Sequence, residues 1–214
     1  MTRILIADDH TIVRDGLRRI LQGAPGIEVA GEATCGDEVM ERVRAGGFDL
    51  LLLDMSMPGK SGIELIKWVK TTRAELVVLV LSMHQEEQYA VRAIRAGASG
   101  YVTKESASAL LVAAIRKVAE GGMYISPGVA EQLALTLRPQ ADRLPHQALS
   151  DREFEVLGLL VEGAGVTDIA ERLHLSSKTV STHKARILEK MGMDSVADLV
   201  RYSITHNLGK DRGE

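Results

Sequence analysis

The chain has 214 residues, of which 45% are hydrophobic and 26% charged, and its formal net charge is −3 at pH 7. These values are ordinary for a soluble globular protein and fit one large domain or two modest ones. The longest apolar runs are about six residues, far too short to span a membrane. The N-terminal apolar stretch is too short for a signal peptide, and the single cysteine, Cys35, excludes an internal disulfide. We therefore expect a cytoplasmic protein.

In the first half of the chain, short apolar runs alternate with stretches of helical periodicity. The runs predict strands over residues 3–8, 27–33, 50–54, 76–81 and 99–103. The stretches between and after them predict helices over residues 11–22, 37–45, 63–72, 86–96 and 107–120. Five strands that alternate with five helices indicate an α/β fold with a doubly wound parallel sheet. The flavodoxin-like strand order 2-1-3-4-5 is the natural choice, because it places strands one, three and four side by side.

Beyond residue 122 this alternation stops. Ser126-Pro127 opens a short helix, and residues 138–147 contain prolines and polar residues, which is typical of a linker. From Leu149 onward the pattern is entirely helical, and we expect Thr167 to cap the second of these helices. The four predicted helices run from a capping box at Ser150 to Val161 and over residues 167–173, 177–191 and 196–206. They predict a small all-α domain.

Polar side chains stand at the ends of four predicted strands, at Asp8-Asp9, Asp54, Ser82 and Lys104. Open α/β sheets place their sites at the carboxyl ends of the strands, so we expect these groups to converge at one edge. Three clustered carboxylates repel one another and favour a divalent cation, and hard oxygen ligands with room for water suit Mg²⁺. A carboxylate beside a cation and a lysine can act as a nucleophile toward a phosphoryl group.

In this order, and together with Met57-Pro58-Gly59, Gly62 and Tyr101, these landmarks resemble the receiver domain of two-component response regulators. The match covers roughly residues 1–124. The resemblance implies that Asp54 is the phosphoacceptor. It also implies that Asp9 and Asp54 ligate Mg²⁺ directly, helped by the Ser56 carbonyl, while Asp8 acts mainly through a water molecule.

The same resemblance assigns three residues to the phosphoryl group and to a conformational switch. Lys104 would pair with the phosphoryl oxygens, and Ser82 would donate a hydrogen bond to one of them. Tyr101 would change its burial when Ser82 moves. The receiver surface around residues 86–96 and 107–120 would then change between two states.

The predicted helix over residues 177–191 concentrates positive charge. Residues 178–190 include four basic side chains and one acidic side chain, a net of +3, whereas residues 148–214 include nine basic and eleven acidic ones, a net of −2. A basic helix in an otherwise acidic domain is expected of a helix that reads the DNA major groove. With the preceding helix and the short turn at Leu175-Ser176, it has helix-turn-helix proportions.

Residues 148–207 resemble the LuxR-type helix-turn-helix through Leu149-Ser150-Asp151-Arg152-Glu153, Ile169-Ala170, Thr179-Val180 and Lys190-Met191-Gly192. Joined to a receiver, this is the NarL/FixJ arrangement. The resemblance implies base contacts from Ser181, Thr182 and Ala185 and phosphate contacts from Lys178, Lys184, Arg186 and His183. The base-contacting side chains are short, so they can touch a thymine methyl or make single hydrogen bonds, but not a bidentate guanine contact. The stretch over residues 163–168 departs from the family pattern because it lacks a basic side chain.

These patterns divide the chain into a receiver (1–124), a helix and linker (125–147) and a helix-turn-helix domain (148–214). The predicted protein is not an enzyme but a transcriptional regulator without membrane association. A histidine kinase phosphorylates Asp54, and the receiver then controls homodimerisation and binding to double-stranded DNA. Two alternatives are weaker. The basic helix argues against a signalling module that binds only protein, and a phosphatase or mutase would need a second aspartate where Ser56 stands.

Overall fold

The computed structural model describes residues 1–58, 60, 62–82, 87–104, 108–135, 144–206 and 208. The chain forms two compact units, Met1–Gln132 and Leu133–Glu214. Some positions of the predicted pattern, among them Gly59, Glu86 and Ala107, lie outside the described residues. Within the described ranges, no helix is both long and apolar enough to cross a membrane.

The first unit is a five-stranded sheet with the order β2-β1-β3-β4-β5, in which all neighbouring strands are parallel. This confirms the predicted fold class and strand order. The strands are β1 (Thr2–Ala7), β2 (Ile27–Ala33), β3 (Leu50–Asp54), β4 (Val77–Ser82) and β5 (Gly100–Thr103). The helices between and after them are α1 (Thr11–Gln22), α2 (Gly36–Ala45), α3 (Gly62–Thr72), α4 (Glu87–Arg95) and α5 (Ser108–Ala119).

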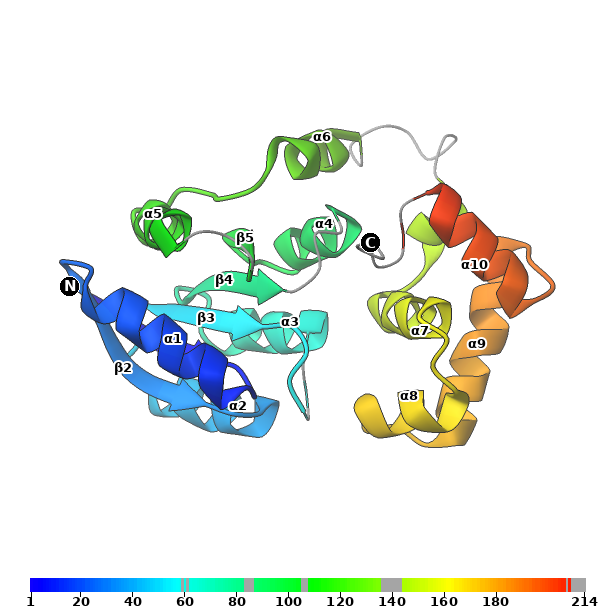
Figure 1. Cartoon of the computed structure of the whole chain (residues 1–214), viewed down its shortest axis with the longest axis horizontal. Coiled ribbons are helices and arrows are strands. Elements are labelled where there is room, and N and C mark those ends of the chain that lie inside the picture. The colour runs from blue at the N-terminus through cyan, green and yellow to red at the C-terminus, as the bar shows by residue number, and fades with distance from the viewer. Residues whose placement is uncertain are drawn as a thin grey trace. The chain divides into compact units, whose positions relative to one another are not determined.

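Helices cover both faces of this sheet (Figure 1). Alternate residues of the central strands, such as Ile4, Leu50 and Leu79, pack with residues of α1 and α5 in one core cluster. Their neighbours along the strands point to the opposite face and are buried as well. Burial on both faces explains why these strands are continuous apolar runs, and it leaves only the strand ends for polar side chains.

The start of α2 abuts the loop that follows β3. The Gly36 N–H donates a hydrogen bond to the Pro58 carbonyl at 3.0 Å. A Cβ atom at Gly36 would lie 1.7 Å from the Lys60 carbonyl oxygen, so only glycine fits at this position. The contact holds part of the loop beyond Asp54 against a neighbouring helix.

The second unit is helical. After α6 (Pro127–Leu135), whose last residues belong to this unit, its described residues form a short 3-10 helix, η2, and four α-helices. Their bounds are η2 (Pro145–Ala148), α7 (Asp151–Val161), α8 (Val166–Arg172), α9 (Ser177–Met191) and α10 (Val196–Thr205). The prediction of Thr167 as the cap of α8 is wrong. Gly165 holds that position, and its N–H donates to the Asp168 carboxylate at 3.3 Å.

Residues at the end of the predicted linker pack within this second unit. His146 in η2 is 1% exposed, and its Nδ1 lies 2.9 Å from the Tyr202 hydroxyl of α10. The His206 ring lies 4.2 Å from the Tyr202 ring, centroid to centroid. The folded helical unit therefore begins at η2 or before it, and a fragment cut at Gln147 would lose the buried histidine.

Candidate functional site

Strand register brings the predicted acidic residues to one edge of the sheet. Ala7 of β1 pairs with Leu53 of β3, so Asp8 and Asp54 follow at equivalent positions on adjacent parallel strands. Asp54 in turn pairs with Leu81 of β4, immediately before Ser82. Carboxyl ends of three neighbouring strands therefore meet, which is the position where open α/β sheets hold their ligands.

Lys104 joins the two buried aspartates. Its Nζ atom lies 2.7 Å from Asp8 Oδ2 and 2.9 Å from Asp54 Oδ2. The lysine side chain is 9% exposed, and each aspartate side chain is 1% exposed. Because these charges are removed from water, their mutual attraction is much stronger than that of a surface ion pair. The lysine stands where it can balance negative charge next to Asp54.

The environment shifts the pKa of both partners upward. Burial raises the pKa of the Asp54 carboxyl above its usual value, and the hydrogen bond from Lys104 only partly opposes this. Burial alone would lower the pKa of Lys104, but the hydrogen bonds and charges of Asp8 and Asp54 outweigh it and raise the pKa. The lysine is therefore held in its charged form.

The acidic cluster has the donors that a hard divalent cation requires. One ligand atom each from Asp8, Asp9, His10 and Asp54 lie within 4.8 Å of one another. Asp9 is 29% exposed, which leaves a side of the cluster open to water. The Ser56 N–H donates to Asp54 Oδ1 at 3.3 Å, so the loop after β3 turns back over the carboxylate. Carboxylate oxygens with access to water fit Mg²⁺.

Ser82 is the last residue of β4, and Tyr101 lies within β5. Ser82 is 1% exposed, and its carbonyl accepts a hydrogen bond from the Lys104 N–H at 2.8 Å. Tyr101 is 8% exposed, and its N–H donates to the Tyr124 carbonyl at 2.9 Å. The Tyr101 side chain is therefore already packed in the core in this conformation.

Sequence reasoning missed two residues beside this cluster. His10 shows no metal-ligand spacing with the other histidines, yet its Nδ1 lies 2.8 Å from Asp9 Oδ1. Arg14 donates a hydrogen bond to the Asp8 backbone carbonyl at 2.7 Å. Their positions in the sequence could have indicated both residues, since His10 follows the two aspartates directly and Arg14 lies one helical turn further on.

In the second unit, α9 packs its apolar stripe against its neighbours. Val180, Ile187 and Met191 are buried, and α9 contacts α7, α8 and η2. Ser176 caps the helix by accepting a hydrogen bond from the Thr179 N–H at 3.1 Å. Gly192 ends it in the left-handed conformation, with φ of 63°. Packing and caps together fix which face of α9 remains outside.

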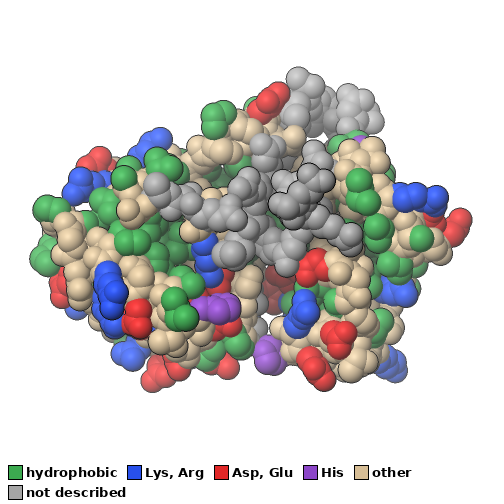
Figure 2. Space-filling model, viewed as in Figure 1, with side chains coloured by type: hydrophobic (Ala, Val, Ile, Leu, Met, Phe, Trp, Pro, Cys, Tyr) green, Lys and Arg blue, Asp and Glu red, His purple; other side chains and the backbone are tan. Residues whose placement is uncertain are grey.

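The predicted DNA contacts lie on or beside that outer face. Five of them are exposed, namely Lys178, Ser181, Thr182, Ala185 and Arg186, whereas His183 and Lys184 are half-buried. Lys190 is different, because its Nζ lies 2.6 Å from the buried carboxylate of Glu153 on α7. Among the described residues, the other three α9 cations that gave the local +3 charge have no acidic partner at ion-pair distance. Elsewhere, on the face shown in Figure 2, basic and acidic side chains are interspersed.

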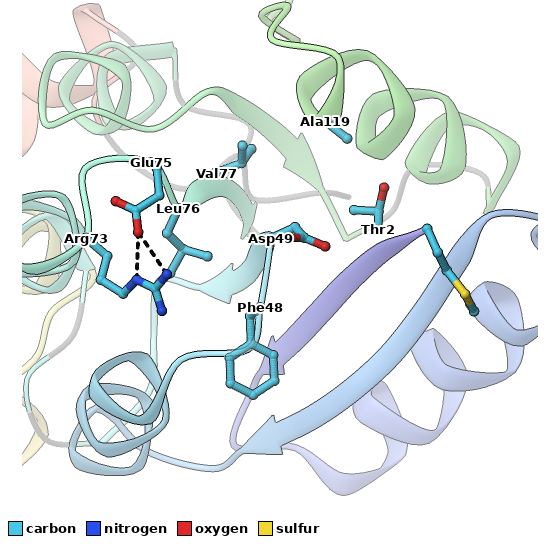
Figure 3. Close-up of a pocket in the computed structure, with 9 residues that line it drawn as sticks. Thr2, Phe48, Asp49, Arg73, Glu75, Leu76, Val77 and Ala119 are labelled. Carbon is cyan, nitrogen blue, oxygen red and sulfur yellow. Dashed lines mark hydrogen bonds and ion pairs between the residues drawn. The ribbon is translucent and has the colours of Figure 1, made fainter.

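A pocket of about 440 Å³ opens at the other end of the sheet, near the start of β1 and before β4 (Figure 3). Its guanidinium, from Arg73, is already paired with Glu75, with both Nε and Nη2 2.8 Å from the same carboxylate oxygen. The Asp49 carboxylate accepts a hydrogen bond from the Arg3 N–H at 2.8 Å. Arg73 and Glu75 of this pocket thus pair with each other, and the Asp49 carboxylate is bonded to a backbone amide.

Family models match a large part of each unit. Residues 4–116 match the response regulator receiver domain, and residues 147–203 match the LuxR family of bacterial regulatory proteins. The chain belongs to the response regulators of two-component systems, in the NarL/FixJ arrangement. It is a phosphorylation-controlled transcriptional regulator and not an enzyme, as the sequence predicted.

Individual relatives match over nearly the whole chain. Response regulator UvrY of Escherichia coli O6:H1 is 37% identical over 209 residues, covering 97% of this chain and 96% of its own. GacA of Pseudomonas aeruginosa is 35% identical, covering 97% and 98%. A structure of RcsB from Salmonella typhimurium gives a TM-score of 0.74 at 30% identity, covering 95% of this chain and 97% of that one. RcsB bound to the rprA promoter in the presence of the phosphomimetic BeF₃⁻ gives 0.69 at 29% identity, covering 94% and 97%.

Proposed function

We propose that Asp54 is the phosphoacceptor and that a histidine kinase supplies the phosphoryl group. The observation that carries this proposal is Lys104, which lies within 2.9 Å of both Asp8 and Asp54 at the carboxyl ends of adjacent strands. A carboxylate oxygen of Asp54 attacks phosphorus while the phosphorus–nitrogen bond of the donor phosphohistidine breaks. Transfer of this kind depends on positioning and on stabilising the charge of the phosphoryl oxygens, and Lys104 is placed for both.

Mg²⁺ fits the same cluster. Asp9 and Asp54 would hold it directly, together with the Ser56 carbonyl, and Asp8 would act through a water molecule. When bound, the ion neutralises negative charge on the carboxylates and on the incoming phosphoryl oxygens. The hydroxyl of Ser82, buried at the adjacent strand end, would donate to a phosphoryl oxygen after transfer.

Phosphorylation would then shift the receiver between two conformations. In this proposal Ser82 moves toward the new phosphoryl oxygens, and β4, β5 and the helices that follow them change position. Tyr101 takes part as a packed core residue that must be rearranged, since its ring is already buried. The coupling between the phosphorylation site and DNA binding is expected to be about 1–3 kcal/mol.

The C-terminal unit would place α9 in the major groove of double-stranded DNA as part of a homodimer. Lys178, Lys184, Arg186 and His183 contact phosphates, whereas Ser181, Thr182 and Ala185 face base edges. Support comes from the exposure of most of these residues on a capped, well-packed helix and from a structure in which two RcsB dimers bind two DNAs. The corresponding parts of the chain are a receiver (1–124), a helix and linker (125–147) whose last residues pack on the following domain, and the DNA-binding domain (148–214), in the cytoplasm.

Phosphate labelling tests the central assignment. Acetyl phosphate with Mg²⁺ should label the wild type, and Asp54→Ala should not be labelled because the nucleophile is gone. Asp9→Asn should lose most of the labelling, since it removes a direct cation ligand while keeping the acceptor. Asp37→Ala, which removes an exposed carboxylate from α2, is the matched control and should be labelled normally. Equal labelling of Asp54→Ala and wild type would refute the proposal.

A further inference from the structure

Arg14 of α1 links three elements around the acidic cluster. Its Nη1 donates to the Asp8 backbone carbonyl at 2.7 Å, and its Nε donates to the Glu32 carboxylate of β2 at 3.2 Å. The Arg14 side chain is only 11% exposed, so this geometry is enclosed by the fold. A guanidinium is a planar fork, and two directed hydrogen bonds fix its orientation better than a lysine ammonium could.

These bonds determine the path of the chain where β1 ends. The Asp8 N–H donates to the Ala33 carbonyl of β2 at 3.1 Å, so Asp8 is held on its amide side by β2 and on its carbonyl side by Arg14. The carbonyl that Arg14 holds belongs to the peptide that joins Asp8 to Asp9. Its position therefore sets where the Asp9 side chain begins.

We propose that Arg14, oriented by Glu32, is a positioning residue that orders the Asp8–Asp9 peptide for the divalent cation. The inference rests on the proposed function, because it requires a cation at the acidic cluster. Groups that hold the ligands of a metal in place, without touching the metal, commonly affect metal affinity strongly. Within the described part of the structure, Arg14 donates hydrogen bonds to no carboxylate of the cluster and reaches it only through the Asp8 backbone carbonyl.

If Arg14 positions the peptide, its removal should weaken cation binding, but simple electrostatics predicts stronger binding. A guanidinium near the cluster repels a cation, and removing it would strengthen cation binding if charge alone mattered. Glu32 offsets much of that charge, since it pairs with both Arg14 and Arg18. Positioning and charge thus give opposite signs for the same substitution, which makes the experiment decisive.

The chain provides a matched control in Arg18. It is on the same helix and its Nη1 lies 2.9 Å from Glu32, but its described contacts are with Glu32 and Asp15 and do not include Asp8. Arg14→Gln and Arg18→Gln each remove one positive charge and one partner of Glu32. Only Arg14→Gln removes the donor to the Asp8 carbonyl.

Mg²⁺ affinity of the full chain, measured by isothermal titration calorimetry, is the first readout. Arg14→Gln should weaken Mg²⁺ binding by about tenfold, whereas Arg18→Gln should bind like the wild type. The second readout is acetyl phosphate labelling as a function of Mg²⁺. For Arg14→Gln, half-maximal labelling should need proportionally more Mg²⁺, and the rate at saturating Mg²⁺ should return to the wild-type value. Arg14→Lys, which keeps a donor and the charge, should recover part of the affinity and provides a test if Arg14→Gln folds poorly.

Several results would overturn the inference. Unchanged or tighter Mg²⁺ binding in Arg14→Gln and Arg14→Lys would show that charge outweighs positioning or that the contact is unimportant. Equal weakening in Arg14→Gln and Arg18→Gln would assign the effect to Glu32 alone. A wild type that binds no Mg²⁺ would refute the proposed cation site itself and this inference with it, which separates the two failures.

Discussion

The receiver and the helix-turn-helix unit carry their functional groups in opposite ways. In the receiver, Asp8, Asp54 and Lys104 are almost completely buried and contact one another. On α9, the side chains assigned to DNA are mostly exposed, and the described residues include no acidic partner for Lys178, Lys184 or Arg186 at ion-pair distance. The side chains of the receiver site contact one another, whereas those on α9 remain accessible to a binding partner.

Because of this difference, the functional groups of the two units should affect folding stability differently. Burial of like charges in the receiver is costly, so the groups proposed to perform the chemistry also destabilise the fold. Exposed side chains on α9 have little effect on folding, and their substitution should change binding alone. Four sets of substitutions test this contrast.

The largest expected effect is on the stability of the helix-turn-helix unit, at a buried charge that has no role in DNA binding. Glu153 accepts hydrogen bonds from the Ser150 N–H at 2.7 Å and from Lys190 at 2.6 Å. Glu153→Ala removes both and should lower the free energy of unfolding by about 1–3 kcal/mol. Since Lys190 is 39% exposed, most of this loss should come from the cap. Chemical denaturation measures it.

A pH series sharpens that prediction. Although burial opposes it, the hydrogen bonds from Lys190 and Ser150 lower the pKa of the Glu153 carboxyl. A lowered pKa in the folded state means that the ionised carboxylate stabilises the fold at neutral pH, and this contribution disappears as the pH falls through the folded-state pKa. Glu153→Gln keeps an oxygen for the Ser150 N–H but removes the charge, so its stability deficit should shrink toward acid pH. A deficit independent of pH would contradict the charge contribution.

The next substitution, Asp54→Asn, should raise folding stability rather than lower it. Burial raises the pKa of the Asp54 carboxyl, so the folded protein binds this proton more tightly than the unfolded chain does. The associated stability is present below the unfolded-state pKa and is lost as the pH rises through the folded-state pKa. Without Mg²⁺ at neutral pH, Asp54→Asn should therefore raise the melting temperature of the receiver, by about 2–4 °C for each kcal/mol gained.

Two controls accompany the Asp54→Asn measurement. The advantage over wild type should shrink as the pH is lowered, because the wild-type carboxyl then becomes neutral as well. Added Mg²⁺ should stabilise the wild type more than the variant. A lower melting temperature for Asp54→Asn would mean that the ion pair with Lys104 outweighs the burial of the carboxylate.

The sequence predicted the receiver site better than its surroundings for a physical reason. Strand ends in a parallel sheet must converge, so Asp8, Asp54 and Lys104 could be brought together from apolar runs alone. Contacts such as Arg14 with Glu32, or Glu153 with Lys190, join residues 18 and 37 positions apart on different elements. Local periodicity has no signal for such pairs, because they depend on the packing of helices against strands or other helices.

A similar reason explains the error at α8 and the interpretation of Lys190. Thr167 is a good capping residue by type, but the helix begins earlier because Asp168 can accept from the Gly165 N–H. Lys190 counts toward the charge of α9 in the sequence, whereas in the structure it is paired with Glu153. Net charge along a helix therefore overestimates the charge that faces a partner.

The third set of substitutions tests DNA binding by Lys184 and uses Lys190 as its control. Lys184→Ala should weaken binding to all DNA sequences alike and flatten the slope of log K against log salt by roughly one unit, as expected for a lost phosphate contact. Lys190→Ala removes an equal charge from the same helix, but one paired with Glu153, so the slope should change little and stability should fall instead. Titrations at several salt concentrations distinguish them. A larger slope change for Lys190→Ala would mean that the docking face is rotated.

The smallest effect concerns a single methyl group on Thr182. Its hydroxyl donates to the Lys178 carbonyl at 3.0 Å, so the proton is already used within the helix, and the methyl group remains for contact. We expect Thr182 to read a thymine methyl rather than to donate to a base. Thr182→Val should then keep the affinity for the preferred site, and Thr182→Ser should lose about 1 kcal/mol.

Replacing thymine by uracil in the DNA probe completes this test. Uracil lacks the methyl group, so wild type, Thr182→Val and Thr182→Ser should bind the substituted site with nearly equal affinity. None of the variants should change the salt slope or the binding to random DNA, because no phosphate contact is altered. If Thr182→Val loses affinity while Thr182→Ser keeps it, the hydroxyl leaves the Lys178 carbonyl on binding and donates or accepts at a base edge. A uniform loss on all sequences would instead place Thr182 against the phosphate backbone.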